Sequence, residues 1–152
     1  MPADIDHRTS FFALAGLALL TAGCTDANRG VRAGAIDADA PKEFTTTNSG
    51  LKYRVLRTAD GRYPTSINTV KVHYRGWLDD GTEFDSSYKR GTPTSFPLKS
   101  VIPGWTEGLQ KVPVGGMIEL EVPPELGYGP QGNSDIPPNS TLHFIVELLD
   151  MH

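Results

Sequence analysis

Residues 70–87 read VKVHYRGWLDDGTEFDSS, and this stretch says more about the fold than any other part of the chain. In its first half, mostly apolar side chains such as Val70 and Val72 alternate with polar ones such as Lys71 and His73. Successive side chains of a strand point to opposite faces. The pattern therefore predicts a strand over residues 70–78. Val70 and Tyr74 belong to the face that turns inward, whereas His73 lies on the outward face.

A tight turn follows this predicted strand. The DDG sequence at residues 79–81 contains residues that tolerate turn geometry, and Gly81 can take a positive φ angle without strain. Phe84 and Asp85 come shortly after the turn. An apolar ring and a carboxylate at adjacent positions can line the mouth of a pocket whose wall includes Tyr74.

The whole chain has 152 residues, of which 38% are hydrophobic and 21% are charged, as is typical of a globular protein. Its formal charge is -4, and no cluster of positive charge suggests a nucleic-acid partner. A single cysteine, Cys24, excludes an intrachain disulfide and a cage of thiolates around a metal. No second histidine or acid stands at ligand spacing from His73, so we expect no metal site.

The N-terminal segment has the layout of an export signal. Residues 11–20 (FFALAGLALL) form an apolar run after Arg8. This run is too short to span a bilayer core of about 30 Å, which needs roughly 20 apolar residues. The sequence LTAGC, which ends at Cys24, resembles the bacterial lipobox, in which the cysteine is lipidated. We therefore expect residues 1–23 to be a lipoprotein signal peptide, with an ordinary cleaved signal or an uncleaved anchor as the alternative.

A lipobox implies a location outside the cytoplasm. Thr25 follows Cys24, which resembles the outer-membrane sorting pattern of Gram-negative bacteria. We expect an exported protein, anchored by the lipid on Cys24 to the bacterial outer membrane and facing the periplasm. Residues 24–43 are rich in Ala, Asp, Gly and Arg without an apolar period, which predicts a flexible tether. The folded domain is then expected over residues 44–152.

The domain is expected to consist mainly of strands. Alternation predicts further strands at residues 51–56, 117–122 and 141–149. Residues 103–110 have helical spacing and predict one short helix that begins at a proline. Amphipathic strands around one helix describe an α+β domain with an antiparallel sheet that is covered on one side.

Four blocks of sequence together resemble one known family. They are VHYRGWLDDGTEFDSS at residues 72–87, VIPGWTEGL at 101–109, ELGYG at 125–129 and IPPNSTLHFIVELL at 136–149. In this order they are similar to the FKBP-type peptidyl-prolyl cis-trans isomerases, over nearly all of the expected domain. The resemblance implies a twisted antiparallel β-sheet of about five strands wrapped round one short α-helix, with the active site between helix and sheet.

The resemblance also implies a pocket for a substrate proline. Trp105 is expected to be its floor, and its walls are expected to be Tyr74, Phe84, Val101, Ile102 and Phe144. Tyr128 and the backbone N–H of Ile102 are expected to hydrogen-bond substrate carbonyl groups. Asp85 is expected beside the amide that is twisted, so that Asp85 and Tyr128 are the catalytic candidates.

Each candidate also has a purely structural interpretation. Trp105, Tyr74 and Phe144 turn inward and would pack in the core without any function. A carboxylate among aromatic rings must find a partner or bear a desolvation cost. The structural alternative for Asp85 is therefore a hydrogen-bond acceptor that pairs with Tyr74 or Arg90.

Two positions depart from the family pattern. Thr94 stands where many members have another aromatic residue at the pocket edge. The loop at residues 130–136 is slightly shorter than in small eukaryotic members, and Asp135 puts a charge near this overhang. We expect both changes to affect substrate preference and macrolide affinity more than catalysis.

The implied activity is rotation about Xaa-Pro bonds of exported proteins. This rotation is slow because partial double-bond character imposes a barrier of about 18–20 kcal/mol. An apolar aromatic pocket disfavours the charge-separated planar amide relative to the twisted one, with no covalent intermediate and no cofactor. The expected partners are Xaa-Pro segments and the macrolide inhibitors tacrolimus and rapamycin, bound by a monomer. The alternative is a chaperone module that binds Pro-containing segments with little catalysis.

Overall fold

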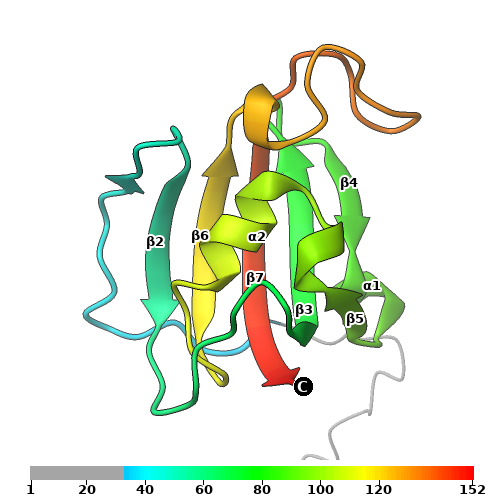
Figure 1. Ribbon diagram of the computed structural model, residues 1–152. Coiled ribbons are helices and arrows are strands. Elements are labelled where there is room, and N and C mark those ends of the chain that lie inside the picture. The colour runs from blue at the N-terminus through cyan, green and yellow to red at the C-terminus, as the bar shows by residue number, and fades with distance from the viewer. Residues whose placement is uncertain (1–32) are drawn as a thin grey trace, which may run out of the picture.

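The computed structural model describes residues 33–152, and within them one sheet contains seven strands (Figure 1). Their order across the sheet is β1 (Thr45–Thr46), β2 (Lys52–Arg57), β6 (Met117–Val122), β7 (Leu142–Met151), β3 (Thr69–Leu78) and β4 (Glu83–Ser86), and β5 (Thr94–Pro97) also pairs with β3. Every strand pair in this part of the chain is antiparallel. The two ten-residue strands, β3 and β7, lie side by side at the centre.

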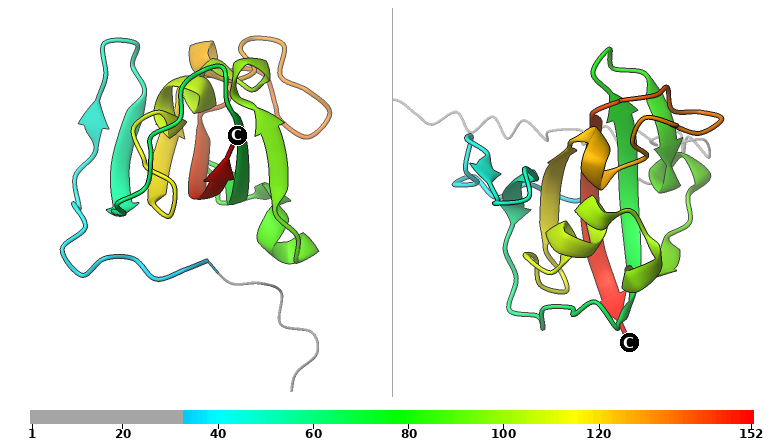
Figure 2. Two further views of the ribbon diagram at one scale, coloured as in Figure 1. Left: turned by 60° about the horizontal axis from the view of Figure 1, so that its bottom comes forward. Right: turned by 45° about the horizontal axis from the view of Figure 1, so that its top comes forward.

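The helices are short. They are α1 (Ser87–Arg90) and α2 (Pro103–Leu109), with two 3-10 turns, η1 (Leu98–Ser100) and η2 (Pro124–Leu126). Figures 1 and 2 show α2 lying across one face of the twisted sheet, in front of β6 and β7. We call this the inner face and the opposite one the outer face.

Alternation along the central strands builds the core on the inner face. Val72, Leu120 and Val146 come from three different strands, and each is fully buried. Because successive side chains of a strand point to opposite faces, the residues before and after each of these three along its strand point to the outer face. The sheet is therefore apolar towards α2 and mostly polar on its other side.

Two glycines let α2 approach the sheet closely. A Cβ atom on Gly104 would lie 2.6 Å from Cγ1 of Val122, and one on Gly108 would lie 2.7 Å from Cδ2 of Leu120. Any larger residue at these positions would push the helix away from β6. The close approach keeps Trp105, on the same helix, buried against the sheet.

The predicted elements and the fold class are confirmed, with differences in number. The strands and the helix expected from the sequence are present as β2, β3, β6, β7 and α2. Within residues 33–152 the sheet has seven strands in place of the predicted five or so. The strands without a predicted range are β1, β4 and β5, which span only two, four and four residues. Strands of this length show too little alternation to be recognised.

Helix α1 was not predicted either. It has four residues, so it contains no repeat of the helical period. Its signals are local: the Ser86 side chain caps its N-terminus, and Gly91 ends it in the left-handed region at φ 71°.

Residues 33–43, which we call the N-terminal strap, are bound to the domain. The N–H of Asp37 donates to the Leu56 carbonyl oxygen (2.8 Å), and the Asp37 carboxylate accepts from the N–H of Thr58 (2.8 Å). In Figure 1 the strap passes behind the sheet. These residues belong to the segment for which the sequence predicts a tether, and here they hydrogen-bond to the end of β2 and the residue after it.

The earlier N-terminal predictions lie outside the described residues. They concern the signal peptide at residues 1–23, the lipidation of Cys24, and the first part of the tether. Among the helices of residues 33–152, none has the length and apolar character that a membrane crossing requires.

Candidate active site

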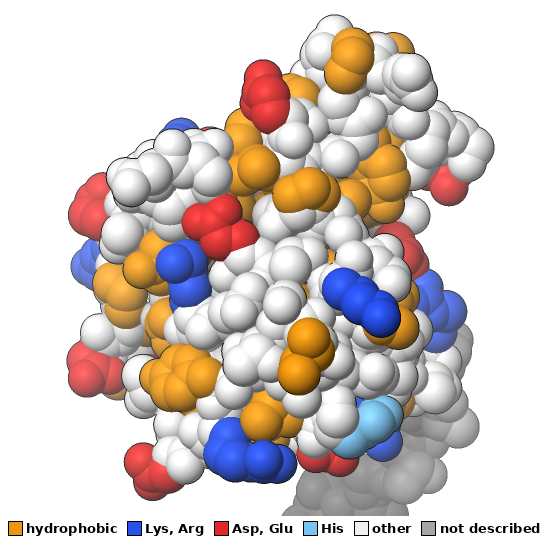
Figure 3. Space-filling view, viewed as in Figure 1, with side chains coloured by type: hydrophobic (Ala, Val, Ile, Leu, Met, Phe, Trp, Pro, Cys, Tyr) orange, Lys and Arg blue, Asp and Glu red, His pale blue; other side chains and the backbone are white. Residues whose placement is uncertain are grey.

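A cavity of about 330 Å³ lies beside α2, at the part of the inner face formed by β3, β4 and β5. Its lining consists of Tyr74, Phe84, Asp85, Phe96, Ser100, Val101, Ile102, Trp105, Tyr128 and Phe144. All eight pocket residues predicted from the sequence are among them. In the space-filling view, hydrophobic side chains gather where the projecting loop at the upper right meets the body of the domain (Figure 3).

The floor of the cavity is the indole of Trp105, and three aromatic rings stand nearly perpendicular to it. The indole of Trp105 meets the rings of Tyr74, Phe96 and Phe144 edge to face, at centroid distances of 5.2, 5.7 and 5.3 Å. Phe84 meets Phe144 in the same manner at 5.5 Å. Each perpendicular pair contributes about 0.5–1.5 kcal/mol beyond the burial of apolar area, so the cage holds its shape.

The indole N–H of Trp105 turns away from solvent. Its Nε1 atom is buried, and among residues 33–152 it has no hydrogen-bond acceptor. The indole therefore presents an apolar surface to the cavity.

Gly76 makes room for two of the cavity rings. A Cβ atom at this position would lie 2.6 Å from Cζ of Phe84 and 2.8 Å from Cε1 of Phe144. Gly76 lies on β3 between its two neighbours β4 and β7, and it pairs with both Asp85 and Phe144. The glycine thus allows both rings to meet above the strand.

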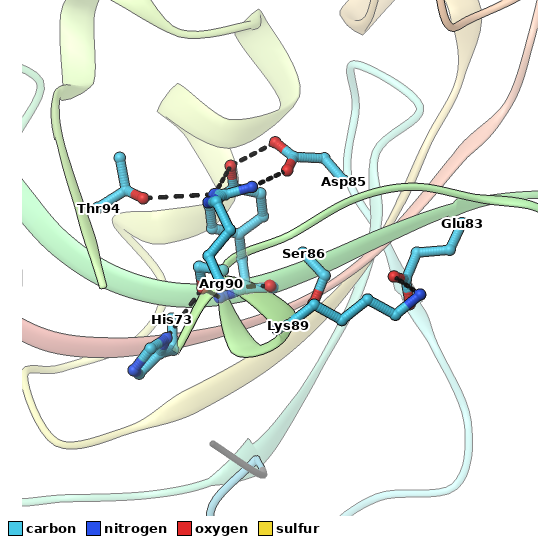
Figure 4. A network of polar contacts seen from close by, with 9 residues as sticks. His73, Glu83, Asp85, Ser86, Lys89, Arg90 and Thr94 are labelled. Atoms are coloured by element: carbon cyan, nitrogen blue, oxygen red, sulfur yellow. Dashed lines mark hydrogen bonds and ion pairs between the residues drawn. The ribbon is translucent and has the colours of Figure 1, made fainter. Parts of the chain in front are cut away.

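Asp85 is the carboxylate of the cavity, and two side chains bind it (Figure 4). Its carboxylate accepts hydrogen bonds from the hydroxyl of Tyr74 and from the guanidinium of Arg90. The guanidinium also donates to the Tyr74 hydroxyl oxygen (3.0 Å) and lies 3.5 Å from the hydroxyl of Thr94. Both structural partners considered for Asp85, Tyr74 and Arg90, are present together.

These contacts fix the protonation states of the group. Burial opposes ionisation of Asp85, but the hydrogen bonds from Tyr74 and Arg90 outweigh it and lower the pKa of the carboxyl. Burial, together with the hydrogen bond to Asp85, raises the pKa of Tyr74 to about 12. At neutral pH Asp85 is therefore an anion compensated by Arg90, and it is poorly suited to accept a proton as a general base.

Two donors stand at the rim. Tyr128 lies just after η2, and 42% of its surface is exposed. Ile102 caps α2, where its carbonyl oxygen accepts from the N–H of Trp105 (2.9 Å). Within the described residues we find no acceptor for the N–H of Ile102, so this group is available to a molecule in the cavity.

The sequence did not indicate Phe96 and Ser100 as lining residues. Phe96 belongs to β5, whose four residues end in a proline and show no clear alternation. Ser100 ends the 3-10 turn η1. A residue in a turn of three residues carries no periodic signal, so neither position could be found from the pattern alone.

His73 lies on the outer face, as predicted, but it is buried. Only 7% of its surface is exposed, because the ring of Tyr88 stacks on it at 4.8 Å. Its Nδ1 atom lies 2.9 Å from the hydroxyl of Ser87. In the described part of the chain, His, Cys, Asp and Glu side chains form no group of three that could hold a metal ion.

The comparisons with known proteins agree with this geometry. A family model described as FKBP-type peptidyl-prolyl cis-trans isomerase matches residues 61–149. The isomerase FkpA of Escherichia coli K12 is 54% identical over 110 residues, which are 72% of this chain and 41% of that protein. A probable isomerase of the same type from Haemophilus influenzae is 54% identical over 112 residues, 73% of this chain and 46% of that protein. The chain thus spans less than half the length of these curated relatives.

Solved structures give the same result. The crystal structure of Escherichia coli FkpA has a TM-score of 0.71 and 54% identity, and the match covers 73% of this chain and 52% of that one. The crystal structure of AtFKBP13 has a TM-score of 0.67 and 35% identity. In that case the match covers 72% of this chain and 99% of the other.

Proposed function

This chain belongs to the FKBP-type peptidyl-prolyl cis-trans isomerase family, and we propose that it accelerates the cis-trans rotation of Xaa-Pro peptide bonds. The observation that carries this proposal is the cavity itself. It joins an apolar floor, Trp105, to a compensated carboxylate, Asp85, and to a hydroxyl at the rim, Tyr128. A proline ring matches such a floor because it is compact and apolar.

In the proposed mechanism the proline ring rests on the indole of Trp105. The planar amide is more polar than the twisted one, because resonance places partial charges on its oxygen and nitrogen. An environment of aromatic rings therefore favours the twisted amide relative to the planar one. No bond is broken, so the reaction requires neither a nucleophile nor a cofactor.

Tyr128 and Ile102 hold the substrate chain on either side of the rotating bond. The hydroxyl of Tyr128 and the N–H of Ile102 each donate to a substrate carbonyl group. Asp85 contributes a fixed negative field beside the amide, and Tyr74 and Arg90 keep that field in place. In this role Asp85 stabilises the rotated geometry and takes no proton.

An NMR exchange or protease-coupled assay on Xaa-Pro peptides tests the proposal. The wild type should raise the isomerisation rate, and Tyr128→Phe should lower kcat/KM roughly fivefold, the loss of about 1 kcal/mol from one hydrogen bond. Tyr63→Phe is the matched control, because Tyr63 is an exposed tyrosine that does not line the cavity, and it should leave the rate unchanged. A wild-type rate equal to the uncatalysed one would refute the enzyme. Peptide binding without acceleration would support a chaperone module.

The partners proposed for this cavity are Xaa-Pro segments of exported proteins and the macrolides tacrolimus and rapamycin. The apolar floor and the free N–H of Ile102 support both. Rapamycin should compete with a proline peptide and reduce isomerase activity. Activity that is unaffected by saturating rapamycin would remove the macrolides from the proposal.

For the location we propose export and lipid attachment at Cys24, to the outer membrane and facing the periplasm. The support is the LTAGC sequence with Thr25 after it, and no described residue bears on it. Mass spectrometry of the mature N-terminus should find a diacylglyceryl Cys24, and Cys24→Ser should release the protein from the membrane fraction. An unmodified Cys24, or cleavage elsewhere, would contradict the proposal.

A further inference from the structure

Two buried serines follow Asp85, and the proposed mechanism uses neither of them. Ser86 accepts a hydrogen bond from the N–H of Lys89 (3.3 Å) and so caps α1. Ser87 is fully buried at the first position of α1, but its hydroxyl points back to the neighbouring strand β3. There it contacts the main chain of Tyr74.

The Ser87 hydroxyl fills a gap in the hydrogen bonding of β3. On the side away from β7, this strand pairs with β5 as far as Val72 and with β4 from Arg75 onward. Between them, in the described sheet, Tyr74 faces no strand partner on that side. The N–H of Tyr74 donates to the Ser87 hydroxyl oxygen (2.8 Å), and the Tyr74 carbonyl oxygen lies 3.3 Å from the same atom. One side chain thus replaces a missing piece of strand.

His73 supports this hydroxyl from behind. A serine hydroxyl donates one hydrogen bond and accepts up to two. The Ser87 hydroxyl already accepts one hydrogen bond, from the N–H of Tyr74. Its proton and its second lone pair are then left for the Tyr74 carbonyl oxygen and for Nδ1 of His73, which lies 2.9 Å away. The stacked ring of Tyr88 shields His73 from solvent. The contact is therefore held in a dry environment, where an unsatisfied polar group is costly.

The same short segment holds Tyr74 from two sides. Asp85 and Arg90 contact the Tyr74 hydroxyl inside the cavity, whereas Ser87 contacts the Tyr74 main chain. The distance between β3 and this segment consequently determines how the Tyr74 hydroxyl meets Asp85. Figure 4 shows His73 on one side of the strand and the Asp85–Arg90 contact on the other.

We propose that Ser87, supported by His73, is a positioning residue for the isomerase reaction: its hydroxyl fixes the Tyr74 main chain so that Tyr74 and Arg90 hold Asp85 beside the substrate amide. The proposal rests on the function proposed above. It predicts that loss of this hydroxyl slows rotation more than it weakens substrate binding, because the apolar floor that binds proline stays intact.

The test compares Ser87→Ala with Ser86→Ala in the full chain. Both variants remove a buried hydroxyl from adjacent positions, but only Ser87 touches Tyr74. Ser87→Ala should lower kcat/KM about fivefold, while the Kd for a proline peptide, from NMR titration, changes less than about twofold. Ser86→Ala should have the smaller effect on kcat/KM. Equal losses in the two variants, or a Kd that rises as much as kcat/KM falls, would overturn the proposal.

NMR spectra give a readout that does not depend on activity. The chain has two tryptophans, so the indole N–H resonance of Trp105 is easily assigned, and the Tyr74 amide reports on the Ser87 contact directly. Both resonances should move in Ser87→Ala and stay in place in Ser86→Ala. If the wild type shows no rate acceleration, the proposed function fails and the catalytic part of the positioning role fails with it, whereas the resonances still show whether the Ser87 hydroxyl fixes the Tyr74 main chain. Unmoved resonances would overturn it.

A second variant covers the case in which Ser87→Ala does not fold. His73→Phe keeps an aromatic ring to stack on Tyr88 but removes the nitrogen that contacts Ser87. It should lower kcat/KM about twofold and move the Tyr74 amide resonance. An unchanged rate together with an unchanged resonance would refute the role of the pair.

Discussion

The two faces of the sheet come from the same strands but are held in different ways. On the inner face, perpendicular aromatic rings and aliphatic side chains pack under α2. On the outer face, ion pairs cross from strand to strand: Lys52 with Glu121 (2.7 Å), Arg54 with Glu119 (2.6 Å) and Arg57 with Glu147 (2.6 Å). A period of two along each strand separates the two sets.

This difference between the faces shows how the protein accommodates charged side chains in two different environments. The outer face spreads its charges over several strands that meet solvent. The cavity instead keeps Asp85, and it compensates this carboxylate with Arg90 from the same short segment. Stability is therefore expected to depend mainly on the inner aromatic residues, and the charge at Asp85 is expected to serve the site more than the fold.

The two tryptophans give the strongest test, because Trp105 of α2 packs against the inner face and Trp77 of β3 lies on the outer face. Trp105→Ala should lower the free energy of unfolding by about 3–5 kcal/mol and abolish isomerase activity, since it truncates a buried aromatic residue at the cavity floor. Trp77→Ala is the control. Trp77 stacks on His143 and under Arg75 on the outer face, so its loss should cost about 1 kcal/mol.

Urea unfolding and a peptide isomerisation assay at a temperature where both variants are folded provide the measurements. Equal costs for the two tryptophans would remove the distinction between the faces.

The long strands could be predicted from the sequence because each carries several alternations. Residues 117–122 are an example, since Ile118 and Leu120 are fully buried and Glu119 lies between them in an ion pair. Strand β5 and helix α1 could not be predicted in the same way. Each has only four residues. Strand β5 forms because it pairs with β3, and α1 forms because the Ser86 side chain caps it, and the pairing of β5 depends on tertiary contacts.

The same limit applies to the site. The eight predicted lining residues followed from sequence blocks that resemble a family, and the structure places all of them around one cavity. Phe96 was missed because it depends on β5. The burial of His73 was missed because Tyr88, which covers it, lies on the unpredicted α1. Local pattern indicated the face of His73 correctly, but only tertiary packing determines its exposure.

Gly76→Ala is expected to have the next largest effect. The added methyl group would overlap the rings of Phe84 and Phe144, so overpacking should cost about 1–3 kcal/mol and weaken the binding of a proline peptide. Gly81→Ala is a useful control, because it meets no neighbour but has a φ angle of 83°. Backbone strain there should cost about 1–2 kcal/mol without changing peptide affinity. An unchanged affinity in Gly76→Ala would show that the ring positions are not critical.

On the outer face, Glu147→Gln should cost about 1–2 kcal/mol. The carboxylate of Glu147 is largely buried and accepts from Arg57, from the hydroxyl of Tyr88 and from the N–H of Gly34 in the N-terminal strap. Glu121→Gln is the control, because its partner Lys52 is about half exposed, and its cost should stay below about 0.5 kcal/mol. Hydrogen exchange should also show faster opening of the strap in Glu147→Gln. Equal protection of the strap in both variants would contradict its attachment through Glu147.

The smallest expected effect concerns Asp85, whose side chain is more than one third exposed. Solvent screening should limit the stability contributed by its contact with Arg90 to less than about 1 kcal/mol, and Asp85→Asn should remove it at neutral pH. The pKa of this carboxyl is lower in the folded protein than its ordinary value of 3.8. The contribution is therefore fully present above pH 3.8 and is lost as the pH falls through the lowered, folded pKa.

The difference in unfolding free energy between wild type and Asp85→Asn should consequently be constant from about pH 7 to pH 5 and should shrink below the ordinary pKa of 3.8. Glu83→Gln serves as the control. Glu83 is an outer-face carboxyl bound by Arg75 and Lys89, and the pKa of Glu83 is also lowered. That variant should keep the Asp85 contribution, and with it the isomerase activity. Asp85→Asn should reduce activity at every pH at which it is folded. A stability loss in Asp85→Asn as large as that of Trp105→Ala would show that the charge supports the fold as much as the aromatic floor does.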